Sequence, residues 1–135
     1  WREFLSYVDG LPEEIVIYHY HHFEATHLRK LAERHGIDPG LEAKLFDGLV
    51  DLHKVLKSSV VLPLYSYGLK PVAKWLGFKW QETKADAAMS MLWFDLWLST
   101  GDQTFLDNSV DYNEDDCRAT KVIKEWLGDV AGTSQ

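Results

Sequence analysis

The sequence predicts an α/β fold that is mostly helical and contains a small parallel sheet. Residues 15–20 are β-branched or aromatic almost throughout, which is typical of a strand. The continuous apolar character of this run favours burial between helices on both faces, as in a parallel sheet. A shorter run at residues 49–52 predicts a second strand. Most of the remaining chain shows the i, i+3, i+4 apolar spacing of amphipathic helices.

Helices are predicted on either side of these strands, and glycine marks several of their ends. The expected helices span residues 1–8, 23–35, 40–48, 53–56, 69–76, 85–98 and 103–108, and a last helix begins at residue 112. Gly36, Gly77 and Gly101 are expected to end the helices that precede them. For the last helix, Asp111 is the expected N-cap, and Glu114 is expected to complete a capping box with it.

The length of 135 residues fits a single domain, and we expect one domain over residues 1–135. The single cysteine, Cys117, excludes an intramolecular disulfide and a zinc site made only of cysteines. It suits a reducing compartment, so a cytoplasmic location is expected. No apolar run in the sequence is long enough to cross a membrane, so no membrane partner is expected.

The formal net charge of −7 argues against a protein that binds nucleic acid over its whole surface. The charge is uneven, because the net charge is −5 for residues 1–51, +5 for residues 52–84 and −7 for residues 85–135. The positive charge of the middle segment comes from Lys54, Lys57, Lys70, Lys74, Lys79 and Lys84. A basic segment between acidic ones could steer a phosphate chain toward an acidic cleft, and solvated lysines on helix faces are the alternative.

An acidic residue stands on the apolar face of the last predicted helix. The inward stripe of that helix comprises Ala119, Val122, Ile123, Trp126 and Leu127. Extended backwards at about 100° per residue, the stripe includes Tyr112 and Asp116. A carboxylate on an apolar face is costly unless a cation or hydrogen-bond donor meets it. The alternative is a first-turn acid that favours the helix dipole and points to solvent.

Glu24 repeats this pattern one turn before Leu28 on the inner face of the predicted helix at residues 23–35. Helices that pack on one parallel sheet bring such positions toward a shared cleft at the strand ends. Two carboxylates held close together repel unless divalent cations bridge them, as in two-metal phosphoryl transfer. Tyr112 lies one turn before Asp116, where its hydroxyl could orient the attacking water.

Two short patterns carry a resemblance to a known family. Tyr112-x-x-x-Asp116 resembles the third exonuclease motif of the DnaQ-like, ribonuclease H-like 3′–5′ exonucleases, in the DEDDy subgroup that has tyrosine at this place. Tyr20-His21-His22-Phe23-Glu24 is similar to the second motif of that superfamily, Asn-x-x-Phe-Asp. Here Tyr20 replaces the asparagine and Glu24 replaces the aspartate.

With tyrosine and glutamate at these two positions, the chain resembles the YprB-type ribonuclease H-like domain of predicted RecB-family nucleases. The resemblance covers about residues 12–128 and includes Tyr18-His19-Tyr20, Val50-Asp51-Leu52, Ser66-Tyr67-Gly68-Leu69-Lys70 and Tyr112-Asn113-Glu114-Asp115-Asp116-Cys117. It implies a metal-dependent nuclease that hydrolyses phosphodiester bonds, with Mg²⁺ or Mn²⁺ as cofactor. Glu24 and Asp116 would be the metal ligands, and Tyr112 would act with them in catalysis.

The family's first motif is an Asp-x-Glu on its first strand, and no Asp-x-Glu occurs in this chain. The resemblance therefore implies the C-terminal portion of a ribonuclease H-like exonuclease fold, without its first strands and first acidic motif. We expect little activity from residues 1–135 alone, and an upstream RecB-like nuclease region as a partner in the parent chain. An unpaired edge on the 15–20 strand would also favour a homodimer.

Nucleic acid is the expected partner, with single-stranded DNA favoured. Lys70, Lys74, Lys79 and His22 are the candidate contacts, and exposed tryptophans among the lysines, such as Trp80, could stack on bases. Core packing is the commoner role of tryptophan.

Three alternative readings remain open at this point. The domain could bind nucleic acid or protein without catalysis, or be a helical interaction fragment with solvated acids. A zinc site made by the histidines at residues 19–35 is less favoured than packing or capping by their side chains, because no zinc-binding spacing is present.

Asp115 is the alternative to Asp116 as a ligand, and Asp51 is expected to cap the next helix. Cys117 lies off the stripe without an evident base, which argues against a thiol nucleophile.

Overall fold

The computed structural model describes residues 1–81 and 86–132. It contains two compact units, Trp1–Pro63 and Leu64–Gln135. Three features expected from the sequence lie outside the described residues: Lys84, the predicted helix start at residue 85, and the last residues of the chain.

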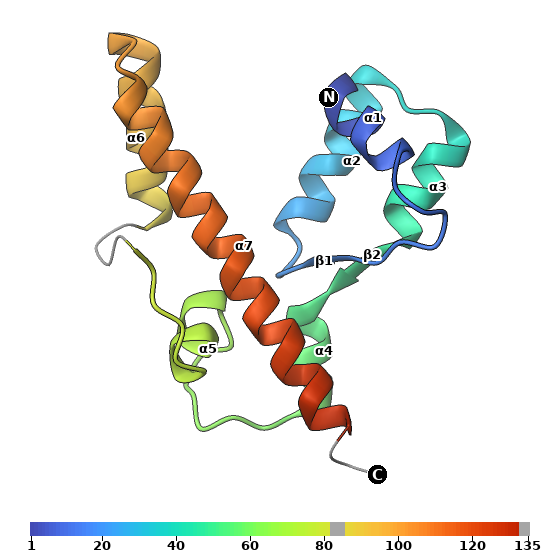
Figure 1. The fold of residues 1–135 in the computed structure, drawn as a ribbon, viewed down its shortest axis with the longest axis vertical. Coiled ribbons are helices and arrows are strands. Elements are labelled where there is room, and N and C mark those ends of the chain that lie inside the picture. The colour runs from blue at the N-terminus through green and yellow to red at the C-terminus, as the bar shows by residue number, and fades with distance from the viewer. Residues whose placement is uncertain (82–85, 133–135) are drawn as a thin grey trace. The chain divides into compact units, whose positions relative to one another are not determined.

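The N-terminal unit holds a two-stranded parallel sheet with helices around it (Figure 1). Its elements are α1 (Arg2–Asp9), β1 (Ile17–His19), α2 (Phe23–His35), α3 (Pro39–Asp47), β2 (Leu49–Asp51) and α4 (Leu52–Ser59). In the parallel register, Ile17 pairs with Leu49 and His19 pairs with Asp51. The small parallel sheet within a mostly helical α/β chain confirms the predicted fold class.

Local sequence signals explain where the helices of this unit begin and end. Asp38 caps α3, because its carboxylate accepts hydrogen bonds from the backbone N–H groups of Gly40 (2.9 Å) and Leu41 (3.3 Å). Pro39 then occupies the first helical position, where its missing N–H costs nothing. Gly36 ends α2 with a φ of 77°, a conformation that L side chains rarely adopt.

The most buried aliphatic side chains of the N-terminal unit come from α1, α3 and α4. Val8, Leu45, Leu52 and Leu56 are fully or almost fully buried. The Lys44 ammonium donates to the carbonyls of Asp9 (3.0 Å) and Leu11 (2.6 Å), which holds α3 against the turn that follows α1. These contacts join α3 to the end of α1 within the unit.

The first strand is shorter and less covered than the sequence predicted. Val16 is 56% exposed and Tyr18 is 42% exposed, whereas His19 and Tyr20 are buried. Burial on both faces is therefore wrong for the described residues. The pleat sends alternate side chains to opposite faces, so Val16 and Tyr18 share the exposed face and His19 lies on the covered one. Tyr20, which is buried, comes directly after the strand.

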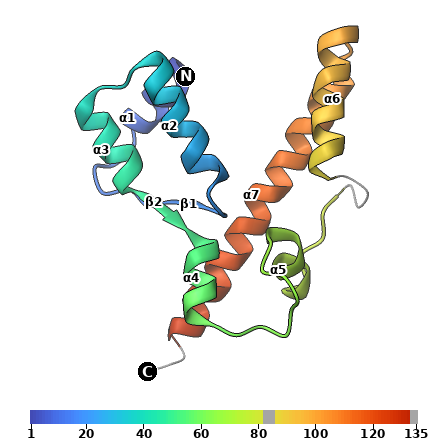
Figure 2. The ribbon, with the colours of Figure 1, turned by 180° about the vertical axis from the view of Figure 1, so that it is seen from behind.

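The C-terminal unit is built from α5 (Leu69–Trp75), α6 (Ala87–Thr100) and α7 (Gln103–Gly132). α6 and α7 lie side by side as a helical hairpin (Figures 1 and 2). Gly101 makes the turn between them in the left-handed conformation, with a φ of 73°. α5 packs against α7 further along the chain, where Val72, Ala73, Ala119 and Ile123 are fully buried.

The predicted break before residue 112 is wrong, because α7 runs without interruption from Gln103 to Gly132. Asp111 lies inside the helix, so it does not cap it. Glu114 instead pairs with Arg118 one turn later, at 2.6 Å. Packing of α7 against both α6 and α5 keeps the helix continuous through residue 111, although the local sequence favours a helix start there. No helix among the described residues is long and apolar enough to span a membrane.

We predict that Gly48→Ala destabilises the N-terminal unit by about 1–3 kcal/mol, because there is no room for a methyl group. A Cβ at this position would lie 2.8 Å from the Ile15 carbonyl oxygen and 3.0 Å from that of Lys44. The Gly48 carbonyl also accepts the Ile17 N–H at 2.7 Å, so a shift there would disturb the start of the sheet. Urea unfolding measures the change.

Gly128→Ala is the matched control, because it lies in α7 with nothing within 4 Å of its Cβ position. This variant should be more stable by up to about 1 kcal/mol, the difference in helix propensity. A Gly48→Ala protein as stable as the parent would contradict the close approach.

Candidate functional site

A cluster of polar and aromatic side chains gathers on one face of α7. We call Lys70, Trp80, Tyr112, Asp115 and Asp116 the α7 cluster. Tyr112 is 9% exposed, Asp115 is 3% exposed, and Asp116 is partly buried, so the predicted projection of acids onto the inner face of this helix is observed. Lys70 comes from α5 and Trp80 from the segment after it.

The Asp116 carboxylate is held by an indole. The Trp80 Nε1–H donates to Asp116 Oδ1 at 2.8 Å, and Trp80 itself is buried. Burial raises the pKa of Asp116 above its ordinary value, and the nearby Asp115 raises it further. The indole hydrogen bond and the Lys70 ammonium act in the opposite direction and favour the ionised form.

The Lys70 ammonium lies over two aromatic rings of the cluster. Its Nζ is 4.9 Å from the ring centroid of Tyr112 and 5.7 Å from that of Trp80. Both distances fall within the range of cation–π attraction. The cation is thus held next to the tyrosine and the carboxylate that the sequence singled out.

Asp115, which the sequence offered only as the alternative ligand, is the more buried of the two adjacent acids. Its Oδ2 accepts the backbone N–H of Gln81 at 2.8 Å, and its Oδ1 accepts the Gln81 side-chain amide at 3.3 Å. The Arg118 guanidinium lies 3.7 Å from Oδ1. These contacts fix the segment after Trp80 against α7, so Asp115 has a structural role here.

A pocket of about 250 Å³ opens beside the cluster. It is lined by Gln81, Trp93, Asn108, Asp111, Tyr112 and Asp115. Tyr112 forms part of its wall, so a small polar group could reach this side chain from solvent.

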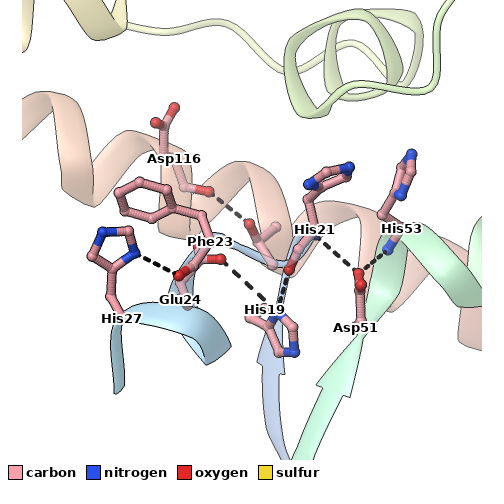
Figure 3. A network of polar contacts seen from close by, with 9 residues as sticks. His19, His21, Phe23, Glu24, His27, Asp51, His53 and Asp116 are labelled. Atoms are coloured by element: carbon pink, nitrogen blue, oxygen red, sulfur yellow. Dashed lines mark hydrogen bonds and ion pairs between the residues drawn. The ribbon is translucent and has the colours of Figure 1, made fainter. Parts of the chain in front are cut away.

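Glu24 belongs to the N-terminal unit, at the start of α2. Its expected position on a buried face is wrong, because the side chain is 50% exposed. Its Oε2 lies 3.8 Å from the Nδ1 of the buried His19 (Figure 3). A metal site shared by Glu24 and Asp116 remains a prediction.

The histidines of this region mostly pack and cap, as the sequence favoured. His19 Nδ1 lies 2.6 Å from the His21 carbonyl, and His27 Nδ1 lies 2.9 Å from the Phe23 carbonyl (Figure 3). His22, a predicted nucleic-acid contact, is exposed and its ring lies 4.2 Å from that of His21. Within the described ranges, no three His, Cys, Asp or Glu side chains form a group that could hold a metal ion.

Asp51 joins the end of β1 to the start of α4. Its Oδ1 accepts the backbone N–H of His53 at 3.0 Å, which confirms the predicted cap (Figure 3). The same oxygen accepts the N–H of His21 at 2.9 Å, where φ is +70°. Burial, reinforced by the Asp51 charge, raises the pKa of Tyr20 to about 12, so this phenol is neutral at physiological pH.

Sequence reasoning missed the role of Trp80, which it considered for base stacking. The side chain is 6% exposed and donates to Asp116 across 36 positions of sequence. No spacing rule connects residues that far apart, so only the packing of α5 and its following segment against α7 reveals the contact. Lys74, Lys79 and Cys117 are exposed.

The parallel strand pair among helices defines an α/β protein. Tyr112 and Asp116, one turn apart on α7, form its candidate hydrolytic site. The RNase_H_2 family model of the RNase H superfamily matches residues 1–128, so the chain belongs to this family. The match spans both compact units. Searches of curated proteins and of solved structures found no match.

Membership in the RNase H superfamily supports three of the coarser expectations. It supports a ribonuclease H-like fold, nuclease-like hydrolysis of nucleic acid, and nucleic acid as the partner. Nucleases of this superfamily usually use divalent metal ions.

We predict that Asp116→Asn stabilises the protein at pH 7. The folded-state pKa is raised above the ordinary 3.8, so folding disfavours the charged form at every pH above the folded value. An amide keeps an oxygen for the Trp80 N–H but carries no charge. The gain should shrink as the pH falls through the folded pKa, and vanish below 3.8, where both states are protonated. Thermal melts from pH 3 to pH 8 measure it.

Asp116→Ala separates the charge from the hydrogen bond. It leaves the buried indole N–H of Trp80 without its acceptor, which costs about 1–3 kcal/mol. This variant should be less stable than Asp116→Asn across the whole pH range. Equal stability of the two variants would contradict the indole–carboxylate bond.

Proposed function

We propose that this chain carries part of the site of a metal-dependent nuclease that hydrolyses phosphodiester bonds, in the manner of 3′–5′ exonucleases. The observation that carries the proposal is the α7 cluster: a partly buried carboxylate and a tyrosine one turn apart, in a chain of the RNase H superfamily. Functional sites often hold carboxylates whose pKa is perturbed by burial, as at Asp116.

The chemistry of the donors fits Mg²⁺ or Mn²⁺, because carboxylate oxygens are the ligands that hard cations prefer. Asp116 would bind through Oδ2, the oxygen that Trp80 does not use. Glu24, which is exposed, would be the second ligand. Within the described ranges no three-ligand group exists, so the site needs further donors. A bound divalent cation would supply charge neutralisation and an acidified water.

Each protein group of the α7 cluster has a distinct proposed task. Trp80 orients the Asp116 carboxylate, and Lys70 favours its ionised form. Tyr112 orients the attacking water through its hydroxyl, and its ring is held by the Lys70 cation at 4.9 Å. Asp115, bound to Gln81, sets the position of the segment that carries Trp80.

The proposed substrate is single-stranded DNA, with Lys70, Lys74, Lys79 and His22 as contacts to it. Lys74, Lys79 and His22 are exposed, and all four are basic or can become so. The proposal also includes a cytoplasmic location, an upstream RecB-like nuclease region, and an edge of the small sheet that could pair with a second copy. Residues 1–135 are proposed to be one partial domain with little activity alone.

A binding module without catalysis is the second candidate. Two observations favour it: Tyr20 and Glu24 differ from the residues of the second exonuclease motif, and the Lys70 cation already lies against the rings of the α7 cluster. Such a module would bind nucleic acid in a salt-sensitive way that needs no metal.

Metal titration tests the nuclease proposal directly. Addition of Mn²⁺ to ¹⁵N-labelled protein should broaden the amide signals of Tyr112, Asp116 and Glu24 first, because paramagnetic relaxation falls steeply with distance. Asp116→Asn should abolish the broadening around residue 116. Asp95→Asn, which removes an exposed carboxylate from α6, is the matched control and should leave it unchanged.

Hydrolysis is the second readout, in a chain that supplies the predicted upstream Asp-x-Glu segment. Fluorescent single-stranded DNA with Mn²⁺ should be degraded from its 3′ end. Asp116→Asn and Tyr112→Phe should each slow degradation by at least about 100-fold, the size of a lost proton-transfer or water-orienting group. Degradation that survives Asp116→Asn would reject the nuclease proposal, while metal-independent binding with no degradation would favour the binding module.

A further inference from the structure

A groove with two permanent cations in its lining lies in the N-terminal unit, on residues other than those of the α7 cluster. Its volume is about 480 Å³, which is in the size range of small-molecule sites. We call it the α2–α4 groove, because it is lined by residues of α2 and α4 with the second strand between them. The lining comprises His19, His22, Ala25, Thr26, Arg29, Phe46, Leu49, Val50, Asp51, Lys54 and Val55.

The permanent cations of the groove come from its two helices. Arg29 stands on α2 and Lys54 on α4, and both are exposed. The Arg29 guanidinium lies 4.5 Å from the ring centroid of Phe46. Stacking on the ring limits the freedom of this side chain and leaves the edge of the guanidinium, with its N–H donors, available for an anion.

The acid in the lining, Asp51, already has partners. Its Oδ1 accepts the backbone N–H groups of both His21 (2.9 Å) and His53 (3.0 Å), so it acts as the cap of α4. These two donors offset part of its charge. The remaining polar groups of the lining are the Thr26 hydroxyl and the rings of His19 and His22, which can donate hydrogen bonds. The His19 Nδ1 already lies 2.6 Å from the His21 carbonyl.

The rest of the lining is apolar. Ala25, Phe46, Leu49, Val50 and Val55 give the groove surfaces that suit a sugar or a base. Cations at the rim beside apolar surface are the combination that proteins use to bind single strands, with the backbone on the charges and the bases on side chains.

We propose that the α2–α4 groove binds the phosphodiester backbone of a single nucleic-acid strand, with Arg29 and Lys54 as its ionic contacts. The proposal rests on the proposed function and deepens it, since the strand would be the substrate of the nuclease. His19 of the groove lining lies 3.8 Å from Glu24, the proposed second metal ligand. Binding of the strand needs no metal ion, because both contacts are permanent cations.

Fluorescence anisotropy with 5′-fluorescein-labelled dT12 in EDTA tests the groove in the full 135-residue chain. Arg29→Glu with Lys54→Glu should weaken binding by roughly tenfold or more through the loss of two ionic contacts. Lys30→Glu with Lys57→Glu is the matched control. It makes the same change of charge on the same two helices, at residues outside the groove lining, and should have a much smaller effect.

The salt dependence of dT12 binding gives an independent measure of how many ionic contacts are lost. For single strands each ionic contact contributes about 0.7 to the slope of log K against log salt concentration, so removing two should make it shallower by about 1.4. Arg29→Ala with Lys54→Ala should show this change, and Lys30→Ala with Lys57→Ala should not. Equal losses in the groove and control variants would overturn the proposal, since only the net charge would then matter.

Nuclear magnetic resonance of the unsubstituted chain tests the same groove without relying on variants, which could fold poorly. Addition of dT12 should shift the amide signals of Thr26, Val50 and Lys54. Binding without shifts at these residues, or no binding at 50 mM salt, would overturn the proposal. Because EDTA removes divalent metals, these results stand whether or not the α7 cluster supports hydrolysis.

Discussion

The hydrogen bond from the Trp80 indole to the Asp116 carboxylate links the sequence segments of the C-terminal unit. It requires α5 and its following segment to pack on α7, and it gives a partly buried acid the donor that it needs. Next to it, Asp115 holds the Gln81 backbone, so two consecutive acids on one helix bind two consecutive residues of another segment. Burial still raises the pKa of Asp116, so this arrangement keeps a carboxylate where a neutral side chain would be more stable.

Such a cost is typical of positions that serve function and not stability. Asp115 satisfies its oxygens on Gln81 and lies near Arg118, which is sufficient to explain a buried acid as structure. Asp116 differs, because the indole uses one oxygen and the cation nearby, Lys70, is held over aromatic rings. In a chain of the RNase H superfamily, this difference makes Asp116 the better candidate ligand of the two.

The N-terminal unit solves a related problem with Asp51. One oxygen of this side chain satisfies the N–H that follows the first strand and the N–H that opens α4. The junction holds His21, whose φ is +70°, next to the end of the second strand and the start of α4. The α2–α4 groove, with Arg29 and Lys54 on its lining, is a consequence of that arrangement. Asp51, a carboxylate with a structural role, is thus also part of the lining of the α2–α4 groove.

The sequence by itself determined the element types, because the periodicity of apolar residues and the positions of glycine are local properties. It predicted the parallel sheet, most helix bounds, the Asp51 cap and the inward projection of Tyr112 and Asp116. It failed at the start of α7, where local capping signals gave way to packing against α5 and α6. It also misplaced Glu24. Only the tertiary structure decided that Trp80 donates to Asp116, because a hydrogen bond between residues 36 positions apart leaves no periodic trace in the chain.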